Sequence, residues 1–261
     1  MFDYHMHSRV SFDSDEDPMK MVRAAEAAGL KEICFTDHID DDPRGLILDQ
    51  RFTFAQYNEA YQDVGSDTVK IRFGMEFGLN PDNQQSFRSY IAGRDFDFVI
   101  GSMHYADSLD VYCAPYWEGK TLFEAERKYL EDTLACVKAH DDFDVLGHLT
   151  YLSKARIHPT HKPIPMEQHR EVTEAILKTL IAKGKGIEIN TSGINRCGDF
   201  LPGEEYLRLY KSLGGEIITM GTDAHTADRV GQYADRACAL LKDIFGYVCT
   251  FENRKPIFHK L

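Results

Sequence analysis

The chain has 261 residues, of which 43% are hydrophobic and 28% charged, and its formal net charge is −12. These proportions are those of an ordinary globular protein, and without a run of about 18 apolar residues a membrane-spanning helix is not expected. The acidic balance disfavours a partner as negatively charged as nucleic acid.

Apolar, strand-like segments alternate with helical patterns along the whole chain. The first helix is predicted to begin after Asp17 as N-cap, with Pro18 in its first turn and Gly29 at its end. A capping box formed by Thr121 and Glu124 predicts the start of another helix. Its expected apolar face consists of Phe123, Leu130, Leu134 and Val137. Further helical patterns cover residues 172–183, 203–213 and 228–244.

Alternation of strands and helices predicts a parallel sheet, and at this length a closed barrel is favoured over an open sheet. We therefore expect an α/β fold with one barrel domain over residues 1–261. The loops that follow the strands are longer and chemically richer than those that precede them, as at residues 40–52, 105–120, 150–166 and 191–202. Barrel enzymes keep their active sites at these carboxyl strand ends.

Seven strand-like segments end in residues that bind metals: FDYHMH, CFTDH, RFGMEF, VIGSMH, DVLGH, GIEIN and IITMGTDAH. His5 and His7 are two residues apart, so in a strand their rings share a face. Glu76 lies within an apolar segment, where a buried carboxylate costs several kcal/mol unless it is paired or bound to a metal. Parallel strands would bring all these ends to one pocket, which predicts a multinuclear metal site.

Imidazole and carboxylate ligands without thiolates suit Zn, Mn or Fe. The ligands are too many for one coordination sphere, so two to three divalent ions are expected as cofactors. A carboxylate such as Glu76 can bridge two ions, and a pair of ions can activate hydroxide and hold both oxygens of a displacement. This is the chemistry of phosphoester hydrolysis.

The motifs HMH, TDH, a strand with a glutamate, GSMH, GH and TDAH closely resemble the PHP (polymerase and histidinol phosphatase) family, in particular its histidinol-phosphate phosphatases. The resemblance extends over essentially the whole chain, including the FENRKP segment at residues 251–256. It implies a distorted (β/α)7 TIM-like barrel with a trinuclear metal centre at the carboxyl strand ends. The reaction it implies is hydrolysis of L-histidinol phosphate to L-histidinol and phosphate, in histidine biosynthesis, by attack of a metal-bridging hydroxide.

The same resemblance implies a role for individual residues. The first metal would be held by His5, His7, Glu76 and Asp223, the second by Glu76, His104 and His148, and the third by Asp13, His38 and His225. Many relatives have His in place of Asp13, so the third site is expected to bind more weakly or to prefer a harder ion. The catalytic residues would be Glu76, Asp223, Arg156 and Arg196.

Substrate contacts are also expected from the loops. Arg156 and Arg196 would bind phosphate, and the alternative for both is a solvated surface position. The amine and imidazole of histidinol would meet Tyr116, Trp117 and Glu118; the alternative for this loop is a lid packed on itself.

Other functions remain open at this point. A PHP nuclease or nucleotide phosphoesterase would keep the site, although the acidic charge disfavours long nucleic acids. An amidohydrolase would need a carboxylated lysine at a strand end, where this chain has Glu76, and a non-catalytic metal-binding domain is the third alternative. We expect a small phosphorylated substrate and no nucleic-acid or membrane partner; the oligomeric state is not predicted. Six cysteines without CxxC spacing and the lack of a secretory signal predict a cytoplasmic protein.

Overall fold

The computed structural model describes residues 1–46, 50–155 and 163–261. Its central sheet consists of parallel strands with the bounds β1 Phe2–Met6, β2 Glu32–Phe35, β3 His38–Ile39, β4 Lys70–Gly78, β5 Phe98–Ser102, β8 Val145–Leu146, β9 Gly186–Asn190 and β10 Ile218–Gly221. The strand order is β1-β2-β4-β5-β8-β9-β10, and the short β3 also pairs with β4.

The sheet curves into a nearly closed barrel because the chain after β10 returns to β1. His7 N donates to Ala224 O over 2.8 Å, and Asp223 N donates to His5 O over 2.8 Å. The path contains seven strands, with β3 as a two-residue continuation after β2. The predicted distorted (β/α)7 barrel is therefore confirmed.

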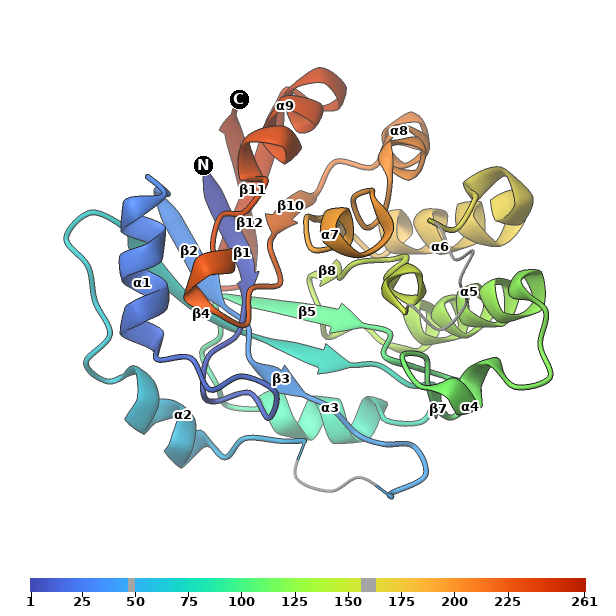
Figure 1. Ribbon diagram of the computed structural model, residues 1–261, viewed down its shortest axis with the longest axis horizontal. Helices are drawn as coiled ribbons and strands as arrows, with labels where there is room; N and C mark the ends of the chain where they lie inside the picture. The colour runs from blue at the N-terminus through green and yellow to red at the C-terminus, as the bar shows by residue number, and fades with distance from the viewer. Residues whose placement is uncertain (47–49, 156–162) are drawn as a thin grey trace.

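Helices surround the strands (Figure 1). The α-helices are α1 Pro18–Ala27, α2 Phe54–Tyr61, α3 Gln84–Ile91, α4 Ala114–Trp117, α5 Leu122–Ala139, α6 Arg170–Ala182, α7 Gly193–Cys197, α8 Glu204–Ser212 and α9 Ala234–Ile244, and the 3-10 helices are η1 Tyr151–Lys154, η2 Met166–His169 and η3 Ala227–Arg229. Two predicted helix starts are confirmed, because the Asp17 side chain caps α1 and Thr121 with Glu124 forms the capping box of α5. In the described part of the chain, no helix has both the length and the apolar character needed to cross a bilayer.

Two details of the predicted helices are wrong. Phe123 is 50% exposed and stacks on His169, with ring centroids 4.8 Å apart, instead of joining the apolar face of α5. Helical side chains lean toward the amino end of their helix. Because Phe123 is in the first turn of α5, its ring extends beyond the helix instead of packing in the core. The helix predicted from residue 228 begins only at Ala234, because Tyr233 has φ 60°, which an α-helix does not allow.

A hairpin of β11 Tyr247–Glu252 and β12 Lys255–Lys260 covers the amino end of the barrel. The Tyr4 hydroxyl donates to Glu32 Oε1 over 2.6 Å and lies 3.1 Å from Phe251 O. The ring of Phe251 packs 4.8 Å from that of Phe98, between centroids. This packing closes the amino end of the barrel, and because the strands are parallel, the residues that end them lie together at the opposite, carboxyl end.

Candidate metal centre

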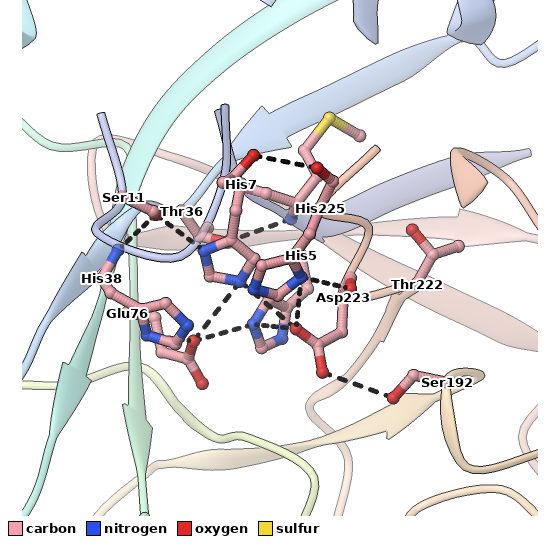
Figure 2. Close-up of polar contacts among 12 residues, drawn as sticks. His5, His7, Ser11, Thr36, His38, Glu76, Ser192, Thr222, Asp223 and His225 are labelled. Atoms are coloured by element: carbon pink, nitrogen blue, oxygen red, sulfur yellow. Dashed lines mark hydrogen bonds and ion pairs between the residues drawn. The ribbon is translucent and has the colours of Figure 1, made fainter. Parts of the chain in front are cut away.

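The carboxyl strand ends bring the predicted metal ligands together. They come from β1 (His5, with His7 one residue beyond its end), the β1–α1 loop (Asp13), β3 (His38), β4 (Glu76), and the residues after β5 (His104), β8 (His148) and β10 (Asp223 and His225). The rings of His5 and His7 lie on one side of the strand, with centroids 5.2 Å apart. Figure 2 shows the labelled imidazoles and carboxylates turned toward one another.

Glu76 lies at the middle of this cluster and is fully buried. Its Oε1 is 2.9 Å from His148 Nε2 and 3.4 Å from His104 Nε2. Its Oε2 is 3.1 Å from His5 Nε2 and 3.1 Å from His38 Nδ1. The two oxygens thus face different imidazoles, which is the arrangement that a bridging carboxylate requires.

A second part of the cluster surrounds His7. Its ring stacks between those of His38 and His225, with centroids 4.2 Å from each. His7 Nε2 lies 3.3 Å from Asp223 Oδ1, and Asp13 Oδ2 lies 3.1 Å from His225 Nε2 and 3.5 Å from His38 Nε2. Asp223 has φ 55°, a left-handed backbone that is uncommon outside glycine and is often found at functional sites.

The donor set fits divalent metal ions. Buried polar atoms without a hydrogen-bond partner among the described residues include His5 Nε2, His7 Nε2, His38 Nδ1 and Glu76 Oε2. Such atoms are costly to bury, and here they face one another rather than an apolar wall. Among the described residues, four groups of three side chains each place their ligand atoms within 4.8 Å of one another: His5–Glu76–His148, His5–His7–Asp223, His38–Asp40–His104 and His7–His38–His225.

The electrostatics keep the two central carboxylates ionised. Burial alone would raise the pKa of Glu76, but imidazoles including His5 and His38 hold this pKa well below its ordinary value. Burial also acts to raise the pKa of Asp223, and the Lys154 ammonium together with nearby imidazoles holds it well below its ordinary value. Ionised carboxylates are the form that binds metals.

Two carboxylates beside the cluster were not predicted. Glu188 Oε1 lies 2.7 Å from His5 Nδ1, and Asp40 Oδ2 lies 2.9 Å from His104 Nδ1. Glu188 could have been found, since it is a carboxylate inside the apolar segment GIEIN, the same signal that identified Glu76. Asp40 could not, because it begins an acidic run at residues 40–42 and nothing distinguishes it there.

Two other strand-end residues support loops instead of joining the cluster. Asn190 donates through Nδ2 to Glu188 Oε2 over 3.1 Å and accepts through Oδ1 from Ser192 N over 3.0 Å. Asp37 accepts from Ser8 N over 2.7 Å. Asp37 thereby holds the backbone that follows His7, and Asn190 holds the backbone that follows β9.

A cavity of about 770 Å³ opens above the cluster and includes His38, His104, Asp223 and His225 in its lining. In the described part of the chain, three cationic side chains also line it: Lys154 in η1 after β8, Arg196 in α7 after β9 and Arg229 in η3 after β10. Because β8, β9 and β10 are neighbours in the barrel, these cations share one part of the rim. Arg156, the other predicted phosphate-binding residue, lies outside the described residues.

Another part of the rim is aromatic and acidic. It follows β5, where the short hairpin of β6 Tyr105–Ala106 and β7 Leu109–Asp110 contributes Tyr105 and Asp110, and Tyr112 follows. Gln50 completes this part and accepts a hydrogen bond from the Tyr105 hydroxyl over 3.2 Å. The cavity therefore presents positive charge and an aromatic, acidic surface from different loops.

None of the three substrate contacts predicted just beyond this hairpin is among the described residues that line the cavity. Tyr116 is fully buried and its hydroxyl donates to Ala125 O over 2.6 Å, because α4 packs against α5. Trp117 donates through Nε1 to Val111 O over 2.9 Å, and Glu118 is exposed; neither is among the described residues that line the cavity. The contacts of Tyr116 and Trp117 are internal to this segment and α5, as in the alternative of a loop packed on itself.

Comparisons with known proteins agree on one family. The family model for the PHP domain matches residues 3–192. A histidinol-phosphatase of Lactococcus lactis subsp. lactis (strain IL1403) is 36% identical over 97% of this chain and 95% of its own, and a probable histidinol-phosphatase of Clostridium acetobutylicum is 27% identical over 99% and 96%. The crystal structure of histidinol phosphate phosphatase from Lactococcus lactis subsp. lactis Il1403, complexed with zinc, L-histidinol and phosphate, matches with a TM-score of 0.82 and 32% identity over 98% of both chains.

Proposed function

The chain belongs to the PHP domain family, and from this membership we propose that it is a metal-dependent phosphatase that hydrolyses L-histidinol phosphate to L-histidinol and phosphate, a step of histidine biosynthesis. The observation that carries the proposal is the convergence of the predicted imidazoles and carboxylates around Glu76, below a cavity with a cationic rim. The Lactococcus lactis relative, whose structure contains L-histidinol and phosphate, supports this choice of substrate.

Two or three divalent ions, zinc, manganese or iron, are the cofactors in this proposal. Glu76 would contribute one oxygen toward His5 and the other toward His148 and His104, as its contacts indicate. His38, His225 and Asp13 would hold a further ion. When bound, such ions supply a hydroxide nucleophile at neutral pH and neutralise charge on the phosphoryl oxygens.

In this proposal the cationic part of the rim binds the phosphate group of the substrate. Arg196 and Arg229 line the cavity from neighbouring loops, and the Lys154 ammonium is held by its ion pair with Asp223, between the ligands and the cavity. Charge-assisted hydrogen bonds from such groups to a phosphoryl group are stronger than neutral ones, and they stabilise the charge that develops in the transition state. Asp223 would therefore bind metal with one oxygen while the other orients the lysine.

The aromatic and acidic part of the rim suits the histidinol moiety. The amine of histidinol is a cation, and Asp110 is a carboxylate in this part of the cavity lining. Tyr105 and Tyr112 offer ring faces and hydroxyls to an imidazole. Asp110 thus takes the role that the sequence had suggested for Glu118.

A substrate panel tests the proposal. Phosphate release from L-histidinol phosphate is compared with release from nucleotides and sugar phosphates, on protein whose metals have been quantified. Selective turnover of L-histidinol phosphate with two to three ions per chain supports the proposal. Bound metal with preference for nucleotides would overturn the substrate, and protein with neither metal nor turnover would overturn the metal-dependent activity itself.

We also propose that the protein is cytoplasmic and acts on a small molecule. All six cysteines are free thiols, as is usual in a reducing compartment. The net charge of −12 disfavours long nucleic acids as substrates.

A further inference from the structure

Glu188 in β9 is a buried carboxylate, 1% exposed, that contacts two of the predicted metal ligands, His5 and His148. Its Oε1 lies 2.7 Å from His5 Nδ1. Its Oε2 accepts hydrogen bonds from His148 N over 2.8 Å and from Asn190 Nδ2 over 3.1 Å. One side chain thereby contacts the ring of one ligand and the backbone of another.

We propose that Glu188 is a positioning residue that sets the orientation and tautomer of His5 and the placement of His148, and so supports two parts of the metal centre at once. The inference rests on the metal centre in the proposed function. A proton on His5 Nδ1 that is donated to Glu188 leaves the Nε2 lone pair directed at the cluster, which is how carboxylates orient metal-binding histidines. His5 belongs to two of the candidate ligand groups, and one of these also contains His148.

The neighbouring strand leaves room for this carboxylate. A Cβ at Gly221, in β10, would overlap both Glu188 Oε1 and the Cβ of His5. Gly221 has no left-handed backbone, so the position needs glycine for space rather than for conformation. The barrel interior is therefore shaped to bring Glu188 and His5 together.

Asp40 offers a comparison within the same centre. Its Oδ2 lies 2.9 Å from His104 Nδ1, and the opposite nitrogen of that ring lies 3.4 Å from Glu76 Oε1. Asp40 belongs to a single candidate group, with His38 and His104. Loss of its charge should affect one ion, whereas loss of the charge on Glu188 should affect two.

Glutamine cannot take over the contacts of Glu188. The carboxylate accepts from three donors, on His5, His148 and Asn190. An amide has one acceptor oxygen, so in either orientation its NH₂ group faces at least one of these donors. The isosteric change therefore either leaves a buried donor without an acceptor or makes His5 Nδ1 the acceptor, which puts the ring proton on the Nε2 that faces the cluster.

The test compares Glu188→Gln with Glu126→Gln. Glu126 is a matched control because it is 2% exposed and lies 3.0 Å from His169 Nε2, but neither residue lines the cavity described above. Each variant is stripped of metal and titrated with zinc against a chelator, cobalt(II) absorption reports the ligand geometry, and unfolding of the metal-free protein reports stability. We expect Glu188→Gln to weaken the binding of two ions by about 10–100-fold and to change the cobalt spectrum. Asp40→Asn should weaken one ion, and Glu126→Gln none.

The outcomes separate this inference from the proposed function. Wild-type protein that binds no metal would overturn both. Wild-type protein that binds metal, with a Glu188→Gln variant that matches Glu126→Gln in affinity and cobalt spectrum, would overturn the inference alone. If Glu188→Gln does not fold, Glu188→Asp provides the decision: it keeps the charge but shortens the reach, and zinc affinity equal to that of wild type would contradict positioning by Glu188.

Discussion

Replacement of Glu76 by glutamine should remove metal-dependent turnover while the barrel stays folded. The side chain is fully buried within β4, and glutamine has nearly the same size and shape, so the packing is preserved. The substitution removes the negative charge and leaves a single acceptor oxygen. Its effect should therefore fall on the metal centre rather than on the core.

The expected size of the effect follows from the position of the two carboxylate oxygens. One lies 2.9 Å from His148 Nε2 and the other 3.1 Å from His5 Nε2, so both face nitrogens that can bind an ion. Two unit charges about 4 Å apart interact by about 4 kcal/mol at an effective dielectric constant of about 20, and a divalent ion doubles this energy. The loss in metal affinity should therefore be at least roughly a thousandfold. Since two ions would share this carboxylate, the binding of both should weaken.

The assay measures metal content by elemental analysis and phosphate release from L-histidinol phosphate, with thermal unfolding as a check on folding. Glu126→Gln is again the control, since it removes a buried carboxylate that contacts a histidine elsewhere. It should keep wild-type metal content and turnover. A folded Glu76→Gln protein with a full metal complement and near-normal turnover would refute the bridging role.

Three further substitutions test other parts of the molecule. Arg196→Ala should lower kcat/KM for L-histidinol phosphate by roughly 10–100-fold, because a charged hydrogen bond to the phosphate is lost. The metal content should be unchanged, and loss of metal would point to a structural role of the arginine. Asp110→Asn should raise KM for L-histidinol phosphate roughly tenfold but leave KM for p-nitrophenyl phosphate, which lacks the amine, unchanged. Equal changes in KM for both substrates would contradict a contact between Asp110 and the amine. Burial raises the pKa of Asp3 to about 6 against hydrogen bonds from Thr222 and Gly231. The folded state thus holds this proton more tightly than the unfolded state, so stabilisation present below about pH 4 is lost as the pH rises through about 6. In urea unfolding between pH 4 and 7, the metal-free wild type should therefore lose about 2 kcal/mol more stability than Asp3→Asn. Parallel pH profiles of the two proteins would exclude this.

The sequence determined the barrel and most of the candidate centre because both depend on local patterns. Alternating strand and helix signals, and caps such as Asp17 and Thr121, gave the order of elements that the structure confirms. Parallel strands carry their last residues to one end of a barrel, so strand-end residues such as His104 and Glu76 could be placed together without knowledge of any contact.

Tertiary structure decided the contacts between side chains from distant parts of the chain. Glu188 and His5 are 183 positions apart, and only the closure of the barrel brings their side chains to 2.7 Å. Tyr116 looked like a loop residue near the substrate, but packing of α4 on α5 buries it, which its own segment does not predict. Local sequence sets which residues end a strand or cap a helix through backbone geometry and periodicity. The partners of a loop or interior side chain depend on which elements pack around it, and that is settled only when the whole barrel has formed.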